Sequence, residues 1–364
     1  MKTCLIQRLN RFCCLGLLAA GMVILMMPAN VQAQYEYTTN ADNTITITGY
    51  TGSNKVLNIA NKINGRSVTC IGGAAFYELA YLTSVTIPNG VTNIGFSAFW
   101  NCSSLTNATI PNTVINIGSF ALNRTCLSKV TIPASVTTIG IGALWTCTNL
   151  MEIAVNPSNS IYSSVGGVLF NKNQTMLIQY PGGRKRCYTI PNGVTSIDGA
   201  FCESYYITSV TIPASVTSIG DGAFYCCTNL TALYFEGDAP SLFKFEEPEP
   251  AFAGDSITTV YYLPGTTGWG AIFGEDHDNP FYISAGCPTS LWLPQICSSC
   301  IQSNAFSFNI NWASGKVAVV ECSTNLLSSS WQPVQTNNMQ ADTCNFSDPN
   351  WTKNPVCFYR VVWQ

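Results

Sequence analysis

The residues that could carry out catalysis are few and scattered. The only histidine, His277, lies between Asp276 and Asp278 in the stretch Gly-Glu-Asp-His-Asp-Asn-Pro, where it could act as a general base or a metal ligand. Adjacent residues in a loop do not converge on one point, and aspartate and asparagine are common turn residues. We therefore expect His277 to have neither a catalytic nor a metal-binding role.

Cys297 and Cys300 have the Cys-x-x-Cys spacing of zinc sites and redox centres. No second pair at matching spacing accompanies them, because Cys322, Cys344 and Cys357 are spread out. In an oxidising compartment the pattern favours disulfides within this part of the chain over a metal site, and it leaves the pairing open. There is also no nucleotide-binding loop, Gly-x-Ser-x-Gly motif or His-Glu-x-x-His motif. We therefore predict no enzyme activity, no cofactor and no metal.

The scaffold that must position any functional residue is a repeat. Copies of Leu-x-x-Val-x-Ile-Pro-x-x-Val-x-x-Ile-Gly-x-x-Ala-Phe start at Leu82, Leu105, Leu127 and Ile207, the first three 22 or 23 residues apart. A fixed period in the twenties predicts a solenoid of leucine-rich-repeat type, in which stacked turns bury what one turn cannot.

Each copy predicts one strand and one arm. Val85 and Ile87 alternate with Ser84 and Thr86, so the apolar pair should point inward and the polar pair outward. Stacking these strands would give one parallel sheet along one side of the solenoid. The apolar residues of Val-x-x-Ile-Gly-x-x-Ala-Phe recur three or four apart, which predicts a short helical or 3₁₀ arm.

These copies resemble the BspA-like bacterial leucine-rich repeats over roughly residues 42 to 286. Seven residues match the consensus of that family in order in each of two copies: Ile87, Pro88, Ile94, Gly95, Ala98, Phe99 and Cys102, and again Ile212, Pro213, Ile219, Gly220, Ala223, Phe224 and Cys227. The resemblance implies a binding or adhesion scaffold with extracellular protein partners.

The flanking segments differ from the repeats. Residues 1–33 combine Lys2, Arg8 and Arg11 with an apolar run and a small-residue site at Val-Gln-Ala, which predicts a signal peptide and a secreted or cell-surface protein, with no membrane-spanning segment after its removal. The alternative is a retained membrane anchor, for which the apolar run is short. Residues 34–286 form the predicted solenoid, with a β-hairpin insertion near 157–187 that resembles one known in the family. Residues 287–364 contain short β-runs between turns and predict a β-sandwich, similar to a C-terminal module of secreted bacterial proteins.

Two properties of the composition bear on partners and on cysteine chemistry. Charged residues make up 10% of the chain and the net charge is −3, so no basic surface predicts nucleic-acid binding. The basic cluster Arg184-Lys185-Arg186 is interpreted as a solvated turn, or less favourably as a contact for an acidic partner. Cys102, Cys126, Cys147 and Cys227 fall at or within one residue of one repeat position, which favours a buried ladder of small apolar residues over disulfides.

Two columns of side chains could bind a partner. One is the outward threonines of the strands, which are Thr86, Thr109, Thr131, Thr189 and Thr211; the alternative is that threonine merely suits an exposed strand. The other follows the Ala-Phe pair and consists of Tyr77, Trp100, Trp145 and Tyr225, interrupted by Asn123 and Cys202. These aromatic residues could bind a glycan, or they could shield the arms from water, which we favour. The sequence thus predicts a binding scaffold with a protein partner on the repeat face. The alternative is a glycan-binding module, and a more remote alternative is a secreted enzyme.

Overall fold

A computed structural model of the chain describes residues 34–242 except 185, residues 251–273 except 253 and 258, and residues 287–363 except 303–304, 327–329 and 352–356. The predicted signal peptide, His277 and the predicted end of the solenoid at residue 286 lie outside these ranges. Within them, no helix has the length and apolar character needed to cross a bilayer.

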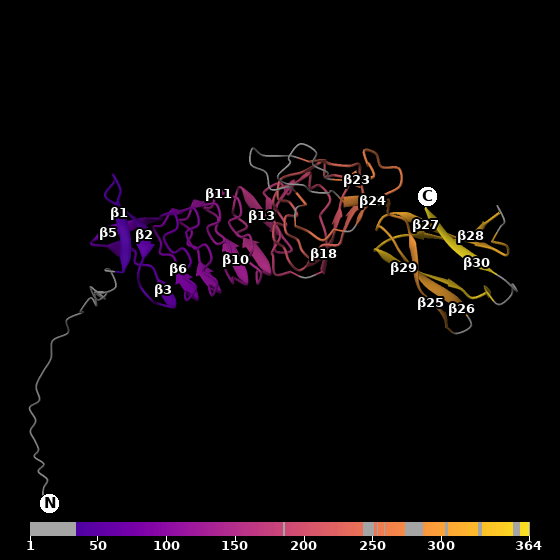
Figure 1. The fold of residues 1–364 in the computed structure, drawn as a ribbon, viewed down its shortest axis with the longest axis horizontal. Helices are drawn as coiled ribbons and strands as arrows, with labels where there is room; N and C mark the ends of the chain where they lie inside the picture. Colours follow the sequence, from indigo (N-terminus) through magenta and orange to yellow (C-terminus); the bar gives the residue numbers. More distant parts are fainter. Residues whose placement is uncertain are drawn as a thin grey trace, which may run out of the picture.

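The described chain is an elongated β-solenoid followed by a second all-β unit at its C-terminal end (Figure 1). Each regular turn contributes two short strands, so the solenoid has two rows of parallel strands. The predicted parallel strands form the first of these rows, and the second row is a feature that the sequence does not predict.

The first row contains the Val-x-Ile-Pro strands. Its members are β3 (Val56–Asn58), β6 (Ser84–Thr86), β8 (Asn107–Thr109), β10 (Lys129–Ile132), β12 (Glu152–Val155), β16 (Arg186–Thr189), β18 (Ile207–Ile212), β20 (Ala232–Phe235), β22 (Thr259–Tyr262) and β24 (Cys287–Leu291), with β23 (Ile272–Phe273) antiparallel to β24. Val85 and Ile87 are buried and Thr86 is exposed, as the alternation predicts. Because β24 pairs in parallel with β22, this sheet extends to Leu291, beyond the predicted end of the solenoid.

The second row forms where the Val-x-x-Ile segment stays extended for two residues. Before the insertion it contains β1 (Tyr35–Thr39), β2 (Ile45–Tyr50), β5 (Arg66–Ile71), β7 (Asn93–Ile94), β9 (Asn116–Ile117) and β11 (Thr138–Ile139), with β4 (Lys62–Ile63) beside β5. After the insertion it contains β17 (Ser196–Ile197), β19 (Ser218–Ile219) and β21 (Ser241–Leu242). The Asn116 side-chain amide donates to Asn93 Oδ1 at 2.5 Å, so polar side chains also pair between turns.

The arms are turns, and the described residues contain no helical arm, contrary to the sequence prediction. In the arm after Gly95, Ser97 and Asn101 have φ of 51° and 54°, which interrupts any helix. The N–H groups of Ser97, Phe99 and Asn101 donate to carbonyls of the next turn at 2.8–2.9 Å. Since alternate amides leave the arm, the i to i−4 pattern of a helix cannot form.

Aromatic side chains of the arms form a ladder inside the solenoid. Phe76 stacks on Phe99 with ring centroids 4.9 Å apart and an interplanar angle of 3°, and Phe201 stacks on Phe224 at 5.1 Å and 8°. Phe99 is fully buried. Between these two stacks the same repeat position holds leucine, at Leu122 and Leu144.

The cysteine ladder is confirmed for three of its four predicted members. Cys102, Cys147 and Cys227 are fully buried, and their thiols donate to carbonyls of the preceding turn at 3.1, 3.2 and 3.0 Å. Cys126 is only half-buried, because Thr125 occupies the ladder position and donates to the Leu122 carbonyl at 2.9 Å. Cys102, Cys126, Cys147 and Cys227 are free thiols, so this ladder contains no disulfide.

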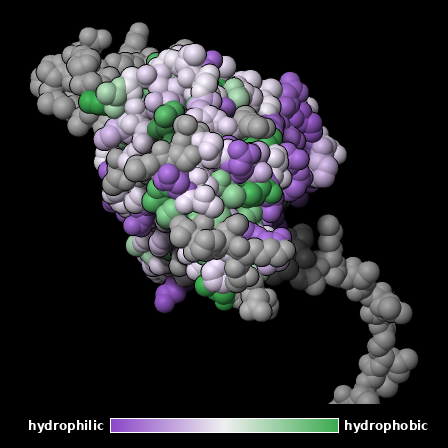
Figure 2. Space-filling model, turned by 90° about the vertical axis from the view of Figure 1, so that its right-hand side faces the viewer, coloured by the Kyte–Doolittle hydropathy of each residue, from purple (hydrophilic) through white to green (hydrophobic). Residues whose placement is uncertain are grey.

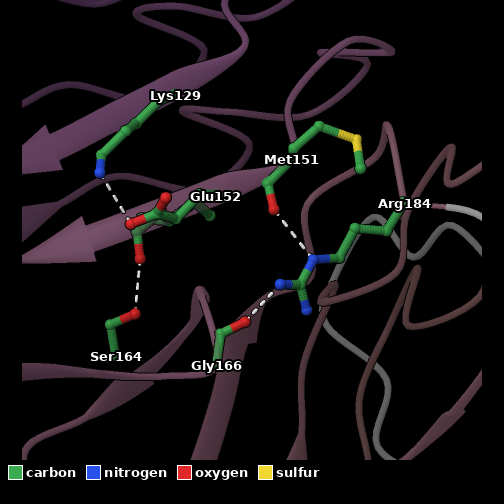
Figure 3. Close-up of polar contacts among 7 residues, drawn as sticks. Lys129, Met151, Glu152, Ser164, Gly166 and Arg184 are labelled. Atoms are coloured by element: carbon green, nitrogen blue, oxygen red, sulfur yellow. Dashed lines mark hydrogen bonds and ion pairs between the residues drawn. The ribbon is translucent and has the colours of Figure 1, made fainter.

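Three antiparallel strands occupy the range predicted for the insertion: β13 (Tyr162–Val165), β14 (Val168–Asn171) and β15 (Met176–Gln179). Figure 3 shows how Arg184 holds them against the solenoid. Its guanidinium donates to the Met151 carbonyl at 2.9 Å and to the Gly166 carbonyl in the first hairpin turn. Arg184 therefore acts as a clamp between two backbone segments, and nearby Lys129 forms an ion pair with Glu152 at 2.9 Å.

The C-terminal unit contains two three-stranded antiparallel sheets. One has the order β25 (Gln295–Gln302), β26 (Ala305–Asn311), β29 (Thr343–Asp348), and the other has the order β28 (Gln332–Asn338), β27 (Val317–Ser323), β30 (Phe358–Trp363). Phe308, Val320 and Phe346 from both sheets share one core, which also includes Leu263 of the solenoid. Figure 2 views the molecule from this end and shows polar and apolar residues interspersed over its surface.

Candidate functional site

The predicted threonine column is aligned across successive turns. Thr86 pairs in register with Thr109, and Thr189 pairs with Thr211. Thr131 lies on β10, opposite Ala154 of β12. Four of these side chains are exposed and Thr211 is half-buried, so the structure places all five on the outward face of the first row.

A neighbouring column on the same face is also polar. Ser84 pairs in register with Asn107, and the Asn107 amide donates to Ser84 Oγ at 3.2 Å. Lys129 and Ser209 occupy the same repeat position on later strands. The face therefore offers hydroxyl, amide and ammonium groups, which suit hydrogen bonding to a partner.

Tyr234 and Tyr261 continue the threonine column, and the sequence analysis did not identify them because it considered only threonines. Thr211 pairs with Tyr234, which pairs with Tyr261. The two rings stack with centroids 5.0 Å apart and an interplanar angle of 12°. Aligning Ala-Leu-Tyr-Phe and Thr-Val-Tyr-Tyr with Ser-Val-Thr-Ile would have placed them in the column from the sequence.

The tyrosines lie in a groove of about 390 Å³ between the outward face and the C-terminal unit. We call this groove the terminal groove. It is lined by Cys187, Thr189, Ser209, Thr211, Tyr234, Tyr261, Leu291, Trp292, Leu293, Gln295, Asn311, Trp312, Asp342 and Thr343. The Trp292 ring lies 4.8 Å from that of Tyr234, and Trp312 Nε1 donates to the Trp292 carbonyl at 2.9 Å.

The terminal groove therefore combines an aromatic wall with hydroxyl, amide and carboxylate groups. Burial and the neighbouring Tyr261 raise the pKa of Tyr234 above its ordinary value, so its hydroxyl is neutral at physiological pH and able to donate a hydrogen bond. Aromatic side chains surrounded by polar groups are typical of the centres of protein interfaces.

The aromatic residues of the arms are packed against one another. The Tyr77 ring, which belongs to the preceding turn, stacks on Trp100 with centroids 4.7 Å apart and an interplanar angle of 11°. The Arg124 guanidinium, from the following turn, lies 5.3 Å from the Trp100 centroid. Trp100 is thus held between two neighbours.

The predicted arm column does not continue evenly past Trp100. Asn123 and Cys202 are buried at its two interruptions. Trp145 packs edge-on against Phe120, with centroids 5.8 Å apart, and Tyr225 is half-buried. These contacts favour shielding of the arms as the role of the column.

The Cys-x-x-Cys pair shows no joint site. A bulge lies between Cys297 and Cys300, and the two thiols contact different neighbours, the Asn309 carbonyl at 3.5 Å and Ser307 Oγ at 3.3 Å. Among the residues that the structure describes, no three histidine, cysteine, aspartate or glutamate side chains are grouped so that they could hold a metal ion.

Solved structures of bacterial repeat proteins resemble this chain. A leucine rich cell surface protein from Faecalibacterium prausnitzii A2-165 is 24% identical, with a TM-score of 0.40, over 64% of this chain and 88% of that one. A leucine-rich repeat protein from Eubacterium ventriosum ATCC 27560 is 24% identical, with a TM-score of 0.45, over 64% and 77%. The pneumococcal vaccine antigen PcpA is 18% identical, with a TM-score of 0.39, over 63% and 85%.

No curated protein matches the chain. The BspA type leucine rich repeat region matches it in six copies, over residues 58–181 and 186–264, which is more than half of its length. The match indicates a repeat scaffold over these residues. This chain belongs to the BspA type leucine-rich repeat family.

Proposed function

We propose that this protein is a secreted or cell-surface scaffold that binds an extracellular protein on the outward face of the first strand row, with the terminal groove as its anchor. The observation that carries the proposal is the register of the column, in which Thr189, Thr211, Tyr234 and Tyr261 lie on consecutive strands. Extended faces of this kind are the usual binding surfaces of solenoids. The predicted signal peptide in residues 1–33 supports the extracellular location.

The terminal groove is the best anchor on this face because it concentrates aromatic area. Tyrosine and tryptophan are enriched at the energetic centres of protein interfaces, and Tyr234, Tyr261 and Trp292 meet here. The threonines that precede them add a polar surface for hydrogen bonds. A protein partner is expected to place a side chain in the groove and to lie along the column.

The glycan alternative has less support. A sugar ring needs one open aromatic face on which to stack. Trp100 has Tyr77 from one turn and Arg124 from the next, and the Tyr234 ring has both Tyr261 and Trp292 beside it. No contact of the arm column or of the groove favours a sugar over a protein side chain.

The proposal is tested by binding of the purified chain to arrays of extracellular proteins and of glycans. Thr189→Lys with Thr211→Lys would place two long cations at the groove. Thr92→Lys with Thr106→Lys adds the same charge at exposed positions outside the column. We expect saturable binding to a protein that the first pair of substitutions abolishes and the second pair preserves. Equal loss in both variants, or binding only to glycans, would overturn the proposal.

A further inference from the structure

The C-terminal unit contains two half-buried cysteines, Cys322 and Cys357, which are both free thiols in the structure. Cys322 lies on β27, and Cys357 immediately precedes β30. These two strands are antiparallel neighbours. The sequence favours disulfides in this unit without indicating which cysteines pair, and the strand register supplies that information.

The register brings the two cysteines onto one face of their sheet. Cys322 lies directly opposite Tyr359, and Cys357 is two residues before Tyr359. Because side chains alternate along a strand, Cys357 lies on the same side as Tyr359 and therefore as Cys322. This is the side that faces the core, since Val320, two residues before Cys322, is fully buried. The pair therefore lies at the end of the core of the C-terminal unit.

The two thiols also interact. Burial, and then the charge of Cys357 and a hydrogen bond with its thiol, raise the pKa of Cys322 above its ordinary value. Diagonal neighbours on one face of a sheet lie about 7 Å apart, at the upper end of the Cα separation that a disulfide spans. Since β30 begins at Phe358, Cys357 lies outside the ladder, and the small backbone shift that a bond requires breaks no strand pairing.

The other cysteines of this unit are placed differently. The thiols of Cys297 and Cys300 contact Asn309 and Ser307 on β26, and neither contact joins two thiols. Cys344 lies on β29, in the sheet that does not contain Cys322. The strand register therefore favours Cys322 and Cys357 as the pair.

We propose that Cys322 and Cys357 form a disulfide bond when the protein meets an oxidant that is itself a disulfide, such as oxidised glutathione. One of the two thiols loses its proton and attacks a sulfur of the oxidant, which releases one thiol and leaves a mixed disulfide. The second cysteine, also deprotonated, attacks the protein sulfur of the mixed disulfide and expels the other half of the oxidant as a thiol. The protein dithiol is thereby oxidised, and the oxidant is reduced to two thiols.

The bond would tie the last described strand to the centre of its sheet. β27 lies between β28 and β30, and the segment enclosed by the bond contains β28 and β29. A cross-link of this kind restricts the unfolded chain and keeps β30 in the sheet. The same unit contributes Trp312 and Asp342 to the terminal groove, so the bond would stabilise one wall of that groove, but its formation does not depend on the proposed function.

The test treats the purified, folded chain with oxidised glutathione at about pH 8.5, near the ordinary pKa of a thiol. Remaining thiols are blocked with iodoacetamide, and tryptic peptides are analysed by mass spectrometry without reduction. Cleavage after Lys316, Lys353 and Arg360 places Cys322 and Cys344 in residues 317–353 and Cys357 in residues 354–360. We expect these two peptides to be joined by a bond that dithiothreitol breaks. Cys357 that is alkylated, still joined to glutathione or linked to another peptide would overturn the proposal.

Two matched variants identify the partner, because Cys322 and Cys344 share a peptide. Cys322→Ser should abolish the linked peptide and Cys344→Ser should keep it, with circular dichroism as the check that both fold. The reverse result would contradict the pairing.

Amide hydrogen exchange tests what the bond does. In the unsubstituted chain, oxidation should slow exchange in residues 358–363 about tenfold or more, whereas in Cys322→Ser it should leave exchange there unchanged. Equal exchange in the oxidised and the reduced chain would contradict the role of the bond in holding β30.

Discussion

Replacing Phe99 tests the stacking of turns, because the chain itself supplies the matched control. Phe99 is fully buried and its ring lies parallel to that of Phe76 at 4.9 Å. Removing a buried phenylalanine side chain costs about 3–5 kcal/mol, so Phe99→Ala should lower the free energy of unfolding by that amount. Phe99→Leu introduces the residue that occupies this repeat position at Leu122 and Leu144. It should lower the free energy of unfolding by only about 1–2 kcal/mol, chiefly through the lost ring contact.

The assay is urea unfolding followed by circular dichroism. With a slope of about 3 kcal/mol per molar, Phe99→Ala should shift the midpoint by about 1 M or more, and Phe99→Leu by about half a molar. The reasoning is refuted if leucine is as costly as alanine, because the arm of this turn would then differ from those that carry leucine. It is also refuted if alanine has no effect.

Three further predictions concern the cysteines, one carboxyl group and the hairpin. Burial raises the pKa of the Cys102 thiol from 9.0 to about 12, so its thiolate population at pH 8 should fall about a thousandfold. Iodoacetamide should therefore label exposed Cys187 and Cys300 in the native protein and Cys102 only in urea. Rapid labelling of Cys102 in the native protein would contradict its burial. Burial raises the pKa of Asp255 from 3.8 to about 6, so the stability contributed by its protonated carboxyl is complete below about pH 4 and is lost as the pH rises through about 6. Asp255→Asn should therefore raise the urea midpoint at pH 7 and not at pH 4. A difference in midpoint that does not vary with pH would contradict this assignment. Arg184→Ala removes two hydrogen bonds to backbone carbonyls and should lower the free energy of unfolding by about 1–2 kcal/mol. Amide hydrogen exchange in residues 162–171 should become faster. Unchanged exchange in these residues would show that Arg184 does not hold the hairpin in place.

The sequence predicts the features of the fold that depend on the side-chain pattern. The period, the inward direction of Val85 and Ile87 and the outward direction of Thr86 all follow from alternation and spacing, and the structure has them. The buried thiols of Cys102, Cys147 and Cys227 follow in the same way, since a recurring small apolar residue marks a position inside the stack.

The arms could not be predicted because their conformation is set by neighbouring turns. The same late arm position holds Asn101, Arg124, Thr146, Glu203 and Cys226, all with φ between 53° and 58°. These residues share no chemistry that favours positive φ. The spacing of the apolar residues is compatible with a helix, but the backbone amides of the arms donate to neighbouring turns and a helix does not form.

The candidate sites could be predicted only in part, because contacts between turns bring some of their residues together. Threonines repeat at one spacing and identify the column, but Tyr234 and Tyr261 belong to it through strand register. The terminal groove also needs Trp292 and Asp342, which are distant in sequence from the repeats. The interruption of the second strand row between β11 and β13 also comes from an irregular turn, and a consensus pattern describes only the regular turns.

The most direct test of the proposed function is the affinity of the Tyr234→Thr, Tyr261→Thr variant for the protein partner found on the array. Threonine is the residue that earlier strands carry in this column, so the fold should be retained. We expect the dissociation constant to rise at least about tenfold, as for a residue at the centre of an interface, while Tyr77→Thr on the arms should leave it within about twofold. An unchanged constant for the double variant, or a loss confined to Tyr77→Thr, would contradict binding at the terminal groove.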